Sequence, residues 1–153
     1  MRVPLTWLLL IWRRLPSPVQ QLYLRWRYGH FAIGVAGLIR DERGRILLVH
    51  RTYSPAEPWA LPGGWLEGRD GVERTLEREL AEETGLRVRV GPVLAAERAG
   101  FALVLLLRVD LVEGSSLAGF TPSAEVSEVA WVDPAEVGSL SPVNARLLRR
   151  ALS

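Results

Sequence analysis

Three glutamates in the segment RELAEE are spaced as neighbours on one face of a helix. Glu79 lies three positions before Glu82 and four before Glu83, and residues at these spacings are adjacent on an α-helix. Like charges placed this way destabilise an isolated helix by roughly 0.2–0.5 kcal/mol per pair. Mg²⁺ prefers a few carboxylates together with waters and substrate phosphate oxygens. The spacing therefore predicts a site for Mg²⁺, with Mn²⁺ as the alternative ion.

A short helix must carry these carboxylates. The pattern predicts a helix over residues 71–84, with Asp70 and Glu73 as a capping-box-like pair at its start. Gly85 stands where helices commonly end in a left-handed residue. Earlier in the chain, Gly63 and Gly64 permit a close backbone approach, so main-chain carbonyls and amides can face an ion or a phosphate. The glycine loop and the helix are expected to form one pocket.

Residues 61–86, LPGGWLEGRDGVERTLERELAEETGL, resemble the signature of the Nudix family. That signature is a glycine, five residues, Glu, seven residues, Arg-Glu, an aliphatic residue, any residue, Glu-Glu, any residue, Gly and an aliphatic residue. One specified position departs, because Asp70 replaces the usual Glu. Asp70 lies at the helix start, so we expect it to alter the loop more than the metal site. The matching positions are Gly64, Arg78-Glu79-Leu80, Glu82-Glu83 and Gly85-Leu86.

The resemblance implies hydrolysis of a nucleoside diphosphate linked to another moiety. It implies that the three glutamates bind divalent ions, that the carbonyl of Gly63 joins them, and that Arg78 orients Glu79. A divalent ion can neutralise charge on phosphate and lower the pKa of bound water, so that hydroxide attacks phosphorus near neutral pH. ADP-ribose, nucleotide sugars, nucleoside triphosphates and similar compounds all fit, and no segment outside the signature indicates which one is used.

Four residues around the glycine loop are candidates for substrate contacts. Gly64 allows the backbone to approach a ligand closely. Arg51 follows a predicted strand and could contact a phosphate, or it could be an exposed strand-end charge. Trp59 and Trp65 could stack on a base or sugar, or they could be aromatic residues at the edge of the core.

A glutamate from a later loop is a candidate general base. The segment FTPSAEVSEVAWVD holds Glu125 and Glu128 next to a predicted strand. We favour Glu125 as an additional metal ligand or as the base that accepts a proton from water. Two alternatives stay open, because no spacing rule fixes these residues: both are exposed charges, or the base is one of the helix glutamates.

The rest of the chain indicates an α+β fold. Strands are expected in HFAIGVAGLIRD, RGRILLVHRTY, LRVRVGPVLAAERA, FALVLLLRVDLV and EVSEVAWV, the first two joined by a polar turn at residues 41–44. The apolar run at residues 103–107 predicts a buried central strand. One helical turn is expected over residues 134–137 and a closing helix over residues 142–152, which ends with two arginines. The Nudix resemblance implies an α/β/α sandwich around a mixed sheet, with the two main helices on opposite faces.

The start of the chain differs in composition, so we divide it into an apolar and basic helical extension, residues 1–28, and a Nudix-like domain, residues 29–153. Residues 1–40 hold six Arg and no acid, whereas the remainder holds 13 Arg against 17 Asp and Glu. The apolar run at residues 5–12 is too short to span a bilayer, which takes roughly 20 residues. The Arg-rich flank after it lacks the small residues of a signal-peptide cleavage site. We therefore expect a cytoplasmic protein.

An amphipathic helix is expected to begin at Pro18, because Val19, Leu22, Tyr23 and Trp26 share one helical face. The favoured interpretation is that this face packs on the sheet or on a partner subunit, as in a homodimer. The alternative is peripheral docking of residues 1–27 at a membrane surface, with tryptophan at the headgroups and arginine near anionic lipid. No nucleic acid partner is expected, since only charge points to one.

Other chemistries are excluded by composition. The chain has no Cys, which removes disulfides, thiol catalysis and Cys-ligated zinc, and no Lys, which removes a phosphate-binding P-loop. His30 and His50 lack metal-ligand spacing and are expected to be ordinary polar residues on strands. Two functions remain: a metal-dependent pyrophosphohydrolase, or a non-catalytic Nudix-like module that binds a nucleotide or a membrane surface. The complete glutamate set favours the enzyme.

Overall fold

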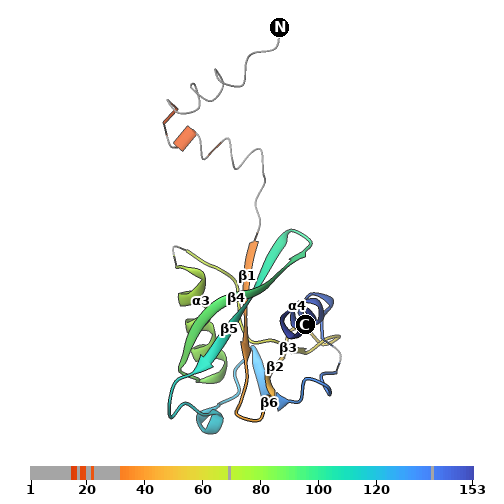
Figure 1. Cartoon of the computed structure of the whole chain (residues 1–153). Coiled ribbons are helices and arrows are strands. Elements are labelled where there is room, and N and C mark those ends of the chain that lie inside the picture. Colours follow the sequence, from red (N-terminus) through yellow and green to blue (C-terminus); the bar gives the residue numbers. More distant parts are fainter. Residues whose placement is uncertain (1–14, 17, 20–21, 23–31, 69, 139) are drawn as a thin grey trace. The chain divides into compact units, whose positions relative to one another are not determined.

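The computed structural model describes residues 15–16, 18–19, 22, 32–68, 70–138 and 140–153 (Figure 1). The chain divides into two units, residues 1–31 and 32–153. In the first unit Pro18, Val19 and Leu22 are helical, which agrees with the expected helix start. The predictions for residues 5–12, for the rest of the amphipathic face and for His30 lie outside the described residues. Among the described residues, no helix is long and apolar enough to cross a membrane.

Six strands of the described chain form two three-stranded sheets. The first sheet has the order β1-β5-β4 and is mixed, because β1 runs parallel to β5 and β4 antiparallel to it. The second has the order β3-β2-β6 and is antiparallel. The strands are β1 (Ala32–Ile39), β2 (Ile46–Arg51), β3 (Trp59–Ala60), β4 (Val88–Ala99), β5 (Ala102–Leu111) and β6 (Val126–Val132).

The predicted polar turn between β1 and β2 forms around one aspartate. The Asp41 carboxylate accepts hydrogen bonds from the amides of Arg43 and Arg45, at 3.0 and 2.8 Å. Beyond this turn only an isolated bridge between Arg40 and Ile46 joins the two strands. β1 instead pairs with β5, and β2 pairs with β3 and β6, so the chain passes from one sheet to the other at the turn.

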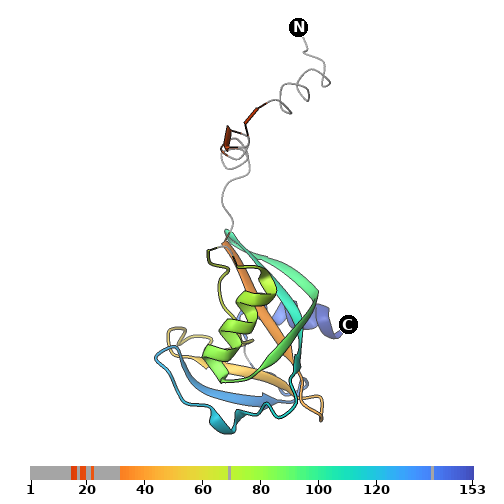
Figure 2. The same ribbon diagram turned by 90° about the vertical axis from the view of Figure 1, so that its left-hand side faces the viewer.

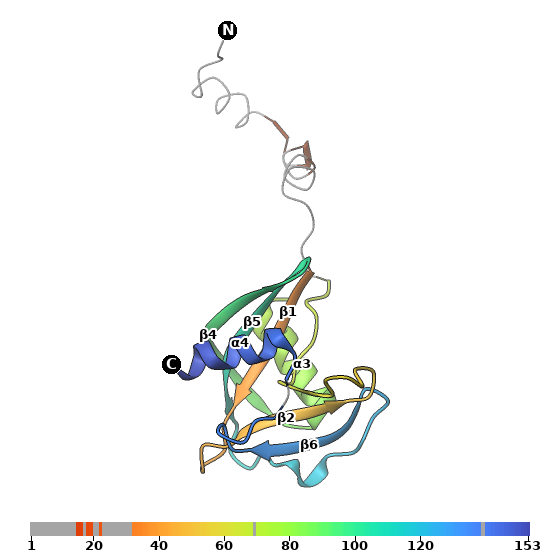
Figure 3. The ribbon, with the colours of Figure 1, turned by 90° about the vertical axis from the view of Figure 1, so that its right-hand side faces the viewer.

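Two helices, α3 (Val72–Thr84) and α4 (Pro142–Leu152), cover opposite faces of the first sheet, as Figures 1, 2 and 3 show from three sides. The predicted α/β/α sandwich is therefore confirmed. The bounds of α4 are those predicted, and Arg149 and Arg150 stand in its last turn. Gly85 ends α3 in the left-handed conformation, also as predicted, with φ 73°.

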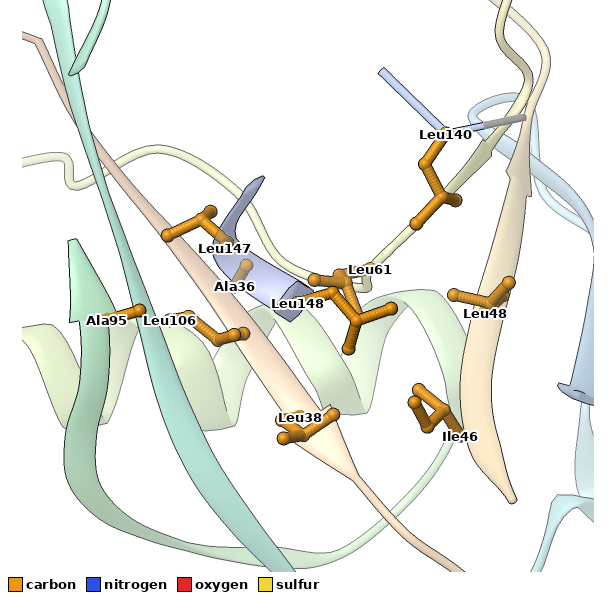
Figure 4. Packing of buried hydrophobic residues seen from close by; sticks show 10 residues of the cluster. All are labelled: Ala36, Leu38, Ile46, Leu48, Leu61, Ala95, Leu106, Leu140, Leu147 and Leu148. Atoms are coloured by element: carbon orange, nitrogen blue, oxygen red, sulfur yellow. The ribbon is translucent and has the colours of Figure 1, made fainter. Parts of the chain in front are cut away.

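The hydrophobic core lies in two layers because neighbouring residues of β1 point to opposite faces. Val35 and Ile39 belong to the layer beneath α3, which contains Leu76 and Leu80 of that helix. The layer beneath α4 contains ten buried residues, shown in Figure 4: Ala36, Leu38, Ile46, Leu48, Leu61, Ala95, Leu106, Leu140, Leu147 and Leu148.

The predicted capping box at the start of α3 is wrong. The N-cap is Gly71, and no side chain caps the helix. Asp70 stands one position too early for its carboxylate to accept from the first-turn amides, and it instead lies 3.9 Å from the Arg74 guanidinium, four residues along. The substituted position of the Nudix signature thus contributes a weak surface ion pair.

Two further predictions need correction. Residues 134–136 form a turn rather than a helical turn, because the Asp133 carboxylate accepts from the amide of Ala135 and the Asp133 carbonyl from that of Glu136, both at 2.8 Å. The run at residues 103–107 does lie on the central strand β5, but Leu103 is 37% exposed. The reason is that the β4–β5 hairpin extends past both helices (Figures 2 and 3).

Candidate active site

The glycine loop before α3 is held against β1 by main-chain hydrogen bonds. Val35 donates to the Gly64 carbonyl and Gly37 to the Pro62 carbonyl, at 2.8 and 2.9 Å. Gly63 has φ 142°, and a Cβ there would overlap the Val35 carbonyl oxygen. A Cβ on Gly64 would overlap the Glu79 carboxylate. Position 63 therefore requires glycine, because a side chain there would overlap the main chain of β1, whereas a side chain at position 64 would displace the Glu79 carboxylate.

Glu83 is the most buried acid near this loop. Glu83 stands in the last turn of α3 and is 9% exposed. Its carboxylate accepts a hydrogen bond from the Gly63 amide at 2.8 Å. Burial raises the pKa of Glu83 to about 7, because desolvation of the charged form outweighs the Gly63 hydrogen bond and the nearby Arg51 charge. The carboxylate is therefore short of positive charge in its surroundings.

Glu79 and Glu82 share one arginine. Arg78 lies 2.8 Å from the Glu79 carboxylate and 3.2 Å from that of Glu82. Burial nevertheless raises the pKa of Glu79 above its usual value, and the Arg78 charge only partly offsets this. Arg78 thus fixes the position of both carboxylates, and it makes the contact that an orienting arginine needs.

The helix glutamates face a loop that comes from the other sheet. Glu79, Glu82 and Glu83 line a cavity of ≈ 290 Å³ together with Ser123, Ala124 and Glu125. This loop is held at the end of β2, where the Thr52 hydroxyl donates to the Ala124 carbonyl at 2.6 Å. Of the two candidate bases, the structure brings only Glu125 to the cavity. Glu128 lies on β6 opposite His50.

The lining of this cavity fits a divalent ion that is completed by other ligands. Within the described residues, no three His, Asp or Glu side chains are arranged to hold an ion on their own. The donors are all carboxylate oxygens, and burial raises the pKa of two of them, so added positive charge would stabilise the site. A hard ion that keeps several waters or binds phosphate oxygens matches such an open set.

A second cavity of ≈ 280 Å³ is lined by the glycine loop, β1, β5 and the start of α4. Trp65 lies against its wall and is 51% exposed. The Trp65 ring would lie 3.4 Å from a Cβ on Gly34, so the absence of a side chain there leaves room for the indole. Asn144 lines the same cavity, and its amide nitrogen donates to the Ser141 hydroxyl at 2.8 Å. Sequence reasoning missed Gly34, Ser141 and Asn144, because no motif links them.

Of the candidate substrate residues Arg51 and Trp59, only Arg51 lines a cavity. Arg51 lines the second cavity, and one of its nitrogens donates to the carbonyls of Leu61 and Gly63 at 3.3 and 3.1 Å. Arg51 is therefore partly buried beside the glycine loop rather than a fully exposed strand-end charge. Trp59 packs on the α4-side core, and the edge of its ring contacts His50 with 5.1 Å between ring centroids. The structure brings Trp59 into neither cavity.

Comparison with known proteins identifies the family. The model of the NUDIX domain matches residues 30–151, and the chain belongs to the Nudix hydrolase family.

Two curated relatives show what kinds of protein share the sequence. An ADP-ribose pyrophosphatase from Methanocaldococcus jannaschii is 33% identical over 99 residues, which are 60% of this chain and 58% of the relative. A CMP-5'-(N-acetyl-N-hydroxy-3-aminopropyl)phosphonate hydrolase from Streptomyces rubellomurinus is 34% identical over 107 residues, which are 67% of this chain and 52% of the relative. The chain thus spans little more than half the length of these relatives.

Solved structures agree on the fold. The crystal structure of an ADP-ribose pyrophosphatase from Streptococcus suis superimposes with a TM-score of 0.67 at 23% sequence identity. The match covers 80% of this chain and 90% of that one. At this level of identity the likeness is one of fold.

Proposed function

We propose that this protein is a Mg²⁺-dependent pyrophosphohydrolase that cleaves the diphosphate linkage of a nucleoside diphosphate joined to another moiety. The observation that carries the proposal is the ≈ 290 Å³ cavity, in which Glu79 and Glu83 have raised pKa values while Glu82 and Glu125 complete the wall. Such a concentration of acid is costly for a binding module and useful for holding an ion against phosphate.

Each glutamate of the cavity has a proposed part in the reaction. Glu79, Glu82 and Glu83, together with the carbonyl of Gly63, would hold the ion, which supplies charge neutralisation and a more acidic bound water. Arg78 holds the first two carboxylates in place through its ion pairs. Glu125 faces them from the opposite wall and would accept the proton of the attacking water. The bond that breaks is the one between phosphorus and the bridging oxygen.

The second cavity would hold the nucleoside part of the substrate. It adjoins the glycine loop, and Trp65 offers an accessible ring face of the kind that stacks on a base or a sugar. The names of the two relatives contain an adenine and a cytosine nucleotide, each joined through phosphate to a second group. This supports the substrate class and leaves the base open.

A substrate panel tests the proposal. Purified protein with Mg²⁺ or Mn²⁺ is incubated with ADP-ribose, nucleotide sugars, nucleoside triphosphates and CMP-linked phosphonates, and released phosphate is measured after a coupled phosphatase. We expect turnover of at least one member and its loss on chelation of the metal. Silence across the panel with both ions would instead indicate a nucleotide-binding module.

Residues 1–27 are proposed to act as a contact segment, since they hold five arginines and no acid. The alternatives from the sequence are the sheet of the domain, a partner subunit and a membrane surface with anionic lipid. Deleting residues 1–27 and comparing both chains by light scattering and by co-sedimentation with anionic vesicles separates them. Loss of vesicle binding supports the membrane, and loss of a dimer supports the partner subunit.

A further inference from the structure

Arg51 lines the second cavity and contacts the glycine loop. Its terminal nitrogen donates to the Gly63 carbonyl at 3.1 Å, while the amide of the same glycine donates to Glu83 at 2.8 Å. The two polar groups of Gly63 are thus each engaged, the amide by an acid of the first cavity and the carbonyl by a cation that lines the second.

This arrangement leaves the Arg51 guanidinium incompletely satisfied. Its Nε is buried and has no hydrogen-bond partner among the described residues. The Tyr53 ring lies 6.0 Å from the guanidinium carbon, at the far limit of a cation–π contact. A buried donor without a partner costs free energy. A side-chain position in which Arg51 contacts an anion would give its Nε a hydrogen-bond acceptor.

The Gly63 carbonyl is also the main-chain oxygen that the Nudix resemblance assigns to the divalent ion. An ion bound to that oxygen at about 2.1 Å would lie within roughly 5 Å of the Arg51 nitrogen that already occupies it. Two cations at this separation repel each other strongly in a partly buried site.

We propose that Arg51 is an internal competitor of the divalent ion: its guanidinium occupies the Gly63 carbonyl in the metal-free protein, leaves that oxygen when the ion binds, and then contacts substrate diphosphate. The proposal rests on the proposed function. It explains why the guanidinium contacts carbonyls here although it lines a cavity suited to a phosphorylated ligand. It also means that Arg51 weakens binding of the divalent ion and strengthens binding of the substrate diphosphate.

Mn²⁺ alone and the non-hydrolysable imidodiphosphate are the probes that test this. Free Mn²⁺ is counted by electron paramagnetic resonance, and imidodiphosphate binding in saturating Mn²⁺ is measured by calorimetry. For Arg51→Gln we expect Mn²⁺ affinity to rise at least about fivefold and imidodiphosphate affinity to fall about tenfold. The matched control Arg40→Gln removes an arginine at the end of β1 that lines a different cavity, and it should change neither affinity.

A merely structural role would weaken both ligands together, so equal or lower Mn²⁺ affinity in Arg51→Gln overturns the proposal. Absence of Mn²⁺ binding in both chains overturns it as well. A second measurement uses the native chain, in which the Arg51 Nε signal, identified with Arg51→Lys, should shift on titration with Mg²⁺. An unmoved signal at saturation also contradicts the proposal. None of these readouts needs turnover, so failure of the proposed function, seen as silence in the substrate panel, is a separate result.

Discussion

The carboxylate cavity and the second cavity are built in opposite ways. The carboxylate cavity takes three of its acids from five consecutive residues of α3 and adds Glu125 from one loop. The second cavity draws its lining from β1, β5, the glycine loop and the start of α4, and its charged group is Arg51. One cavity concentrates negative charge from a single segment, and the other assembles single residues from distant parts of the chain.

This difference indicates a division of labour. Holding an ion needs several like groups at fixed spacing, which one helix provides. Recognising the rest of a substrate needs a shape, which several elements must provide together. Substitutions in the first cavity should therefore act on the rate of the chemical step, and substitutions in the second on substrate affinity and selectivity.

The largest effect is expected from Glu83→Gln. Loss of this charge removes an ion ligand while keeping the side-chain size, so kcat should fall on the order of 10²–10³-fold. Steady-state kinetics with saturating Mg²⁺ measure it. Glu77→Gln, an exposed glutamate on the same helix, is the matched control and should leave kcat unchanged. Full activity in Glu83→Gln would contradict the assignment of the first cavity.

The next effect concerns stability without metal. The folded-state pKa of Glu83 is about 7, above the ordinary 4.5, because burial disfavours the charged form. The protonated Glu83 side chain therefore makes its full contribution to the free energy of unfolding below pH 4.5. This contribution is lost as the pH rises through 7. This loss amounts to about 3 kcal/mol.

Urea unfolding in EDTA between pH 4.5 and 7.5 measures this effect, with Glu83→Gln as the comparison. In the variant, the free energy of unfolding should not show this decrease with pH. Residues of the second cavity should contribute no further decrease over the same pH range. Identical pH profiles for the two chains would show that folding does not raise the pKa of Glu83.

A smaller effect is expected in the second cavity from Trp65→Ala. Stacking on a base contributes about 1–3 kcal/mol, so KM should rise by roughly tenfold or more while kcat changes little. Trp65→Phe keeps a ring and should restore most of the affinity. A fall in kcat at unchanged KM would break the division between the two cavities.

Most of the fold could be predicted from local sequence patterns. The bounds of α4 and the glycine end of α3 follow from periodicity and terminal residues, and the carboxylate cavity follows from one contiguous motif. The failed capping box shows the limit: Asp70 has the right residue type, but the backbone begins the helix one position later.

The second cavity could not be predicted because its residues meet only through tertiary packing. Trp65 fits beside β1 because residue 34 is glycine, and Asn144 arrives there because α4 crosses the sheet. The same limit separates Glu125 from Glu128. They lie three residues apart, but hydrogen bonds from Thr52 to the Ala124 and Glu125 carbonyls hold Glu125 at the carboxylates, whereas Glu128 is paired in β6.

Glu125→Gln should have the smallest effect, about a tenfold loss of kcat. Glu125 is exposed, so a solvent water can partly replace it as proton acceptor, whereas no water can replace the buried Glu83. Glu128→Gln, on β6 outside the cavity, is the control and should be silent in the same assay. A loss as large as that of Glu83→Gln would show that solvent cannot replace Glu125 as proton acceptor, and the chemical step would then depend on this loop as strongly as on α3.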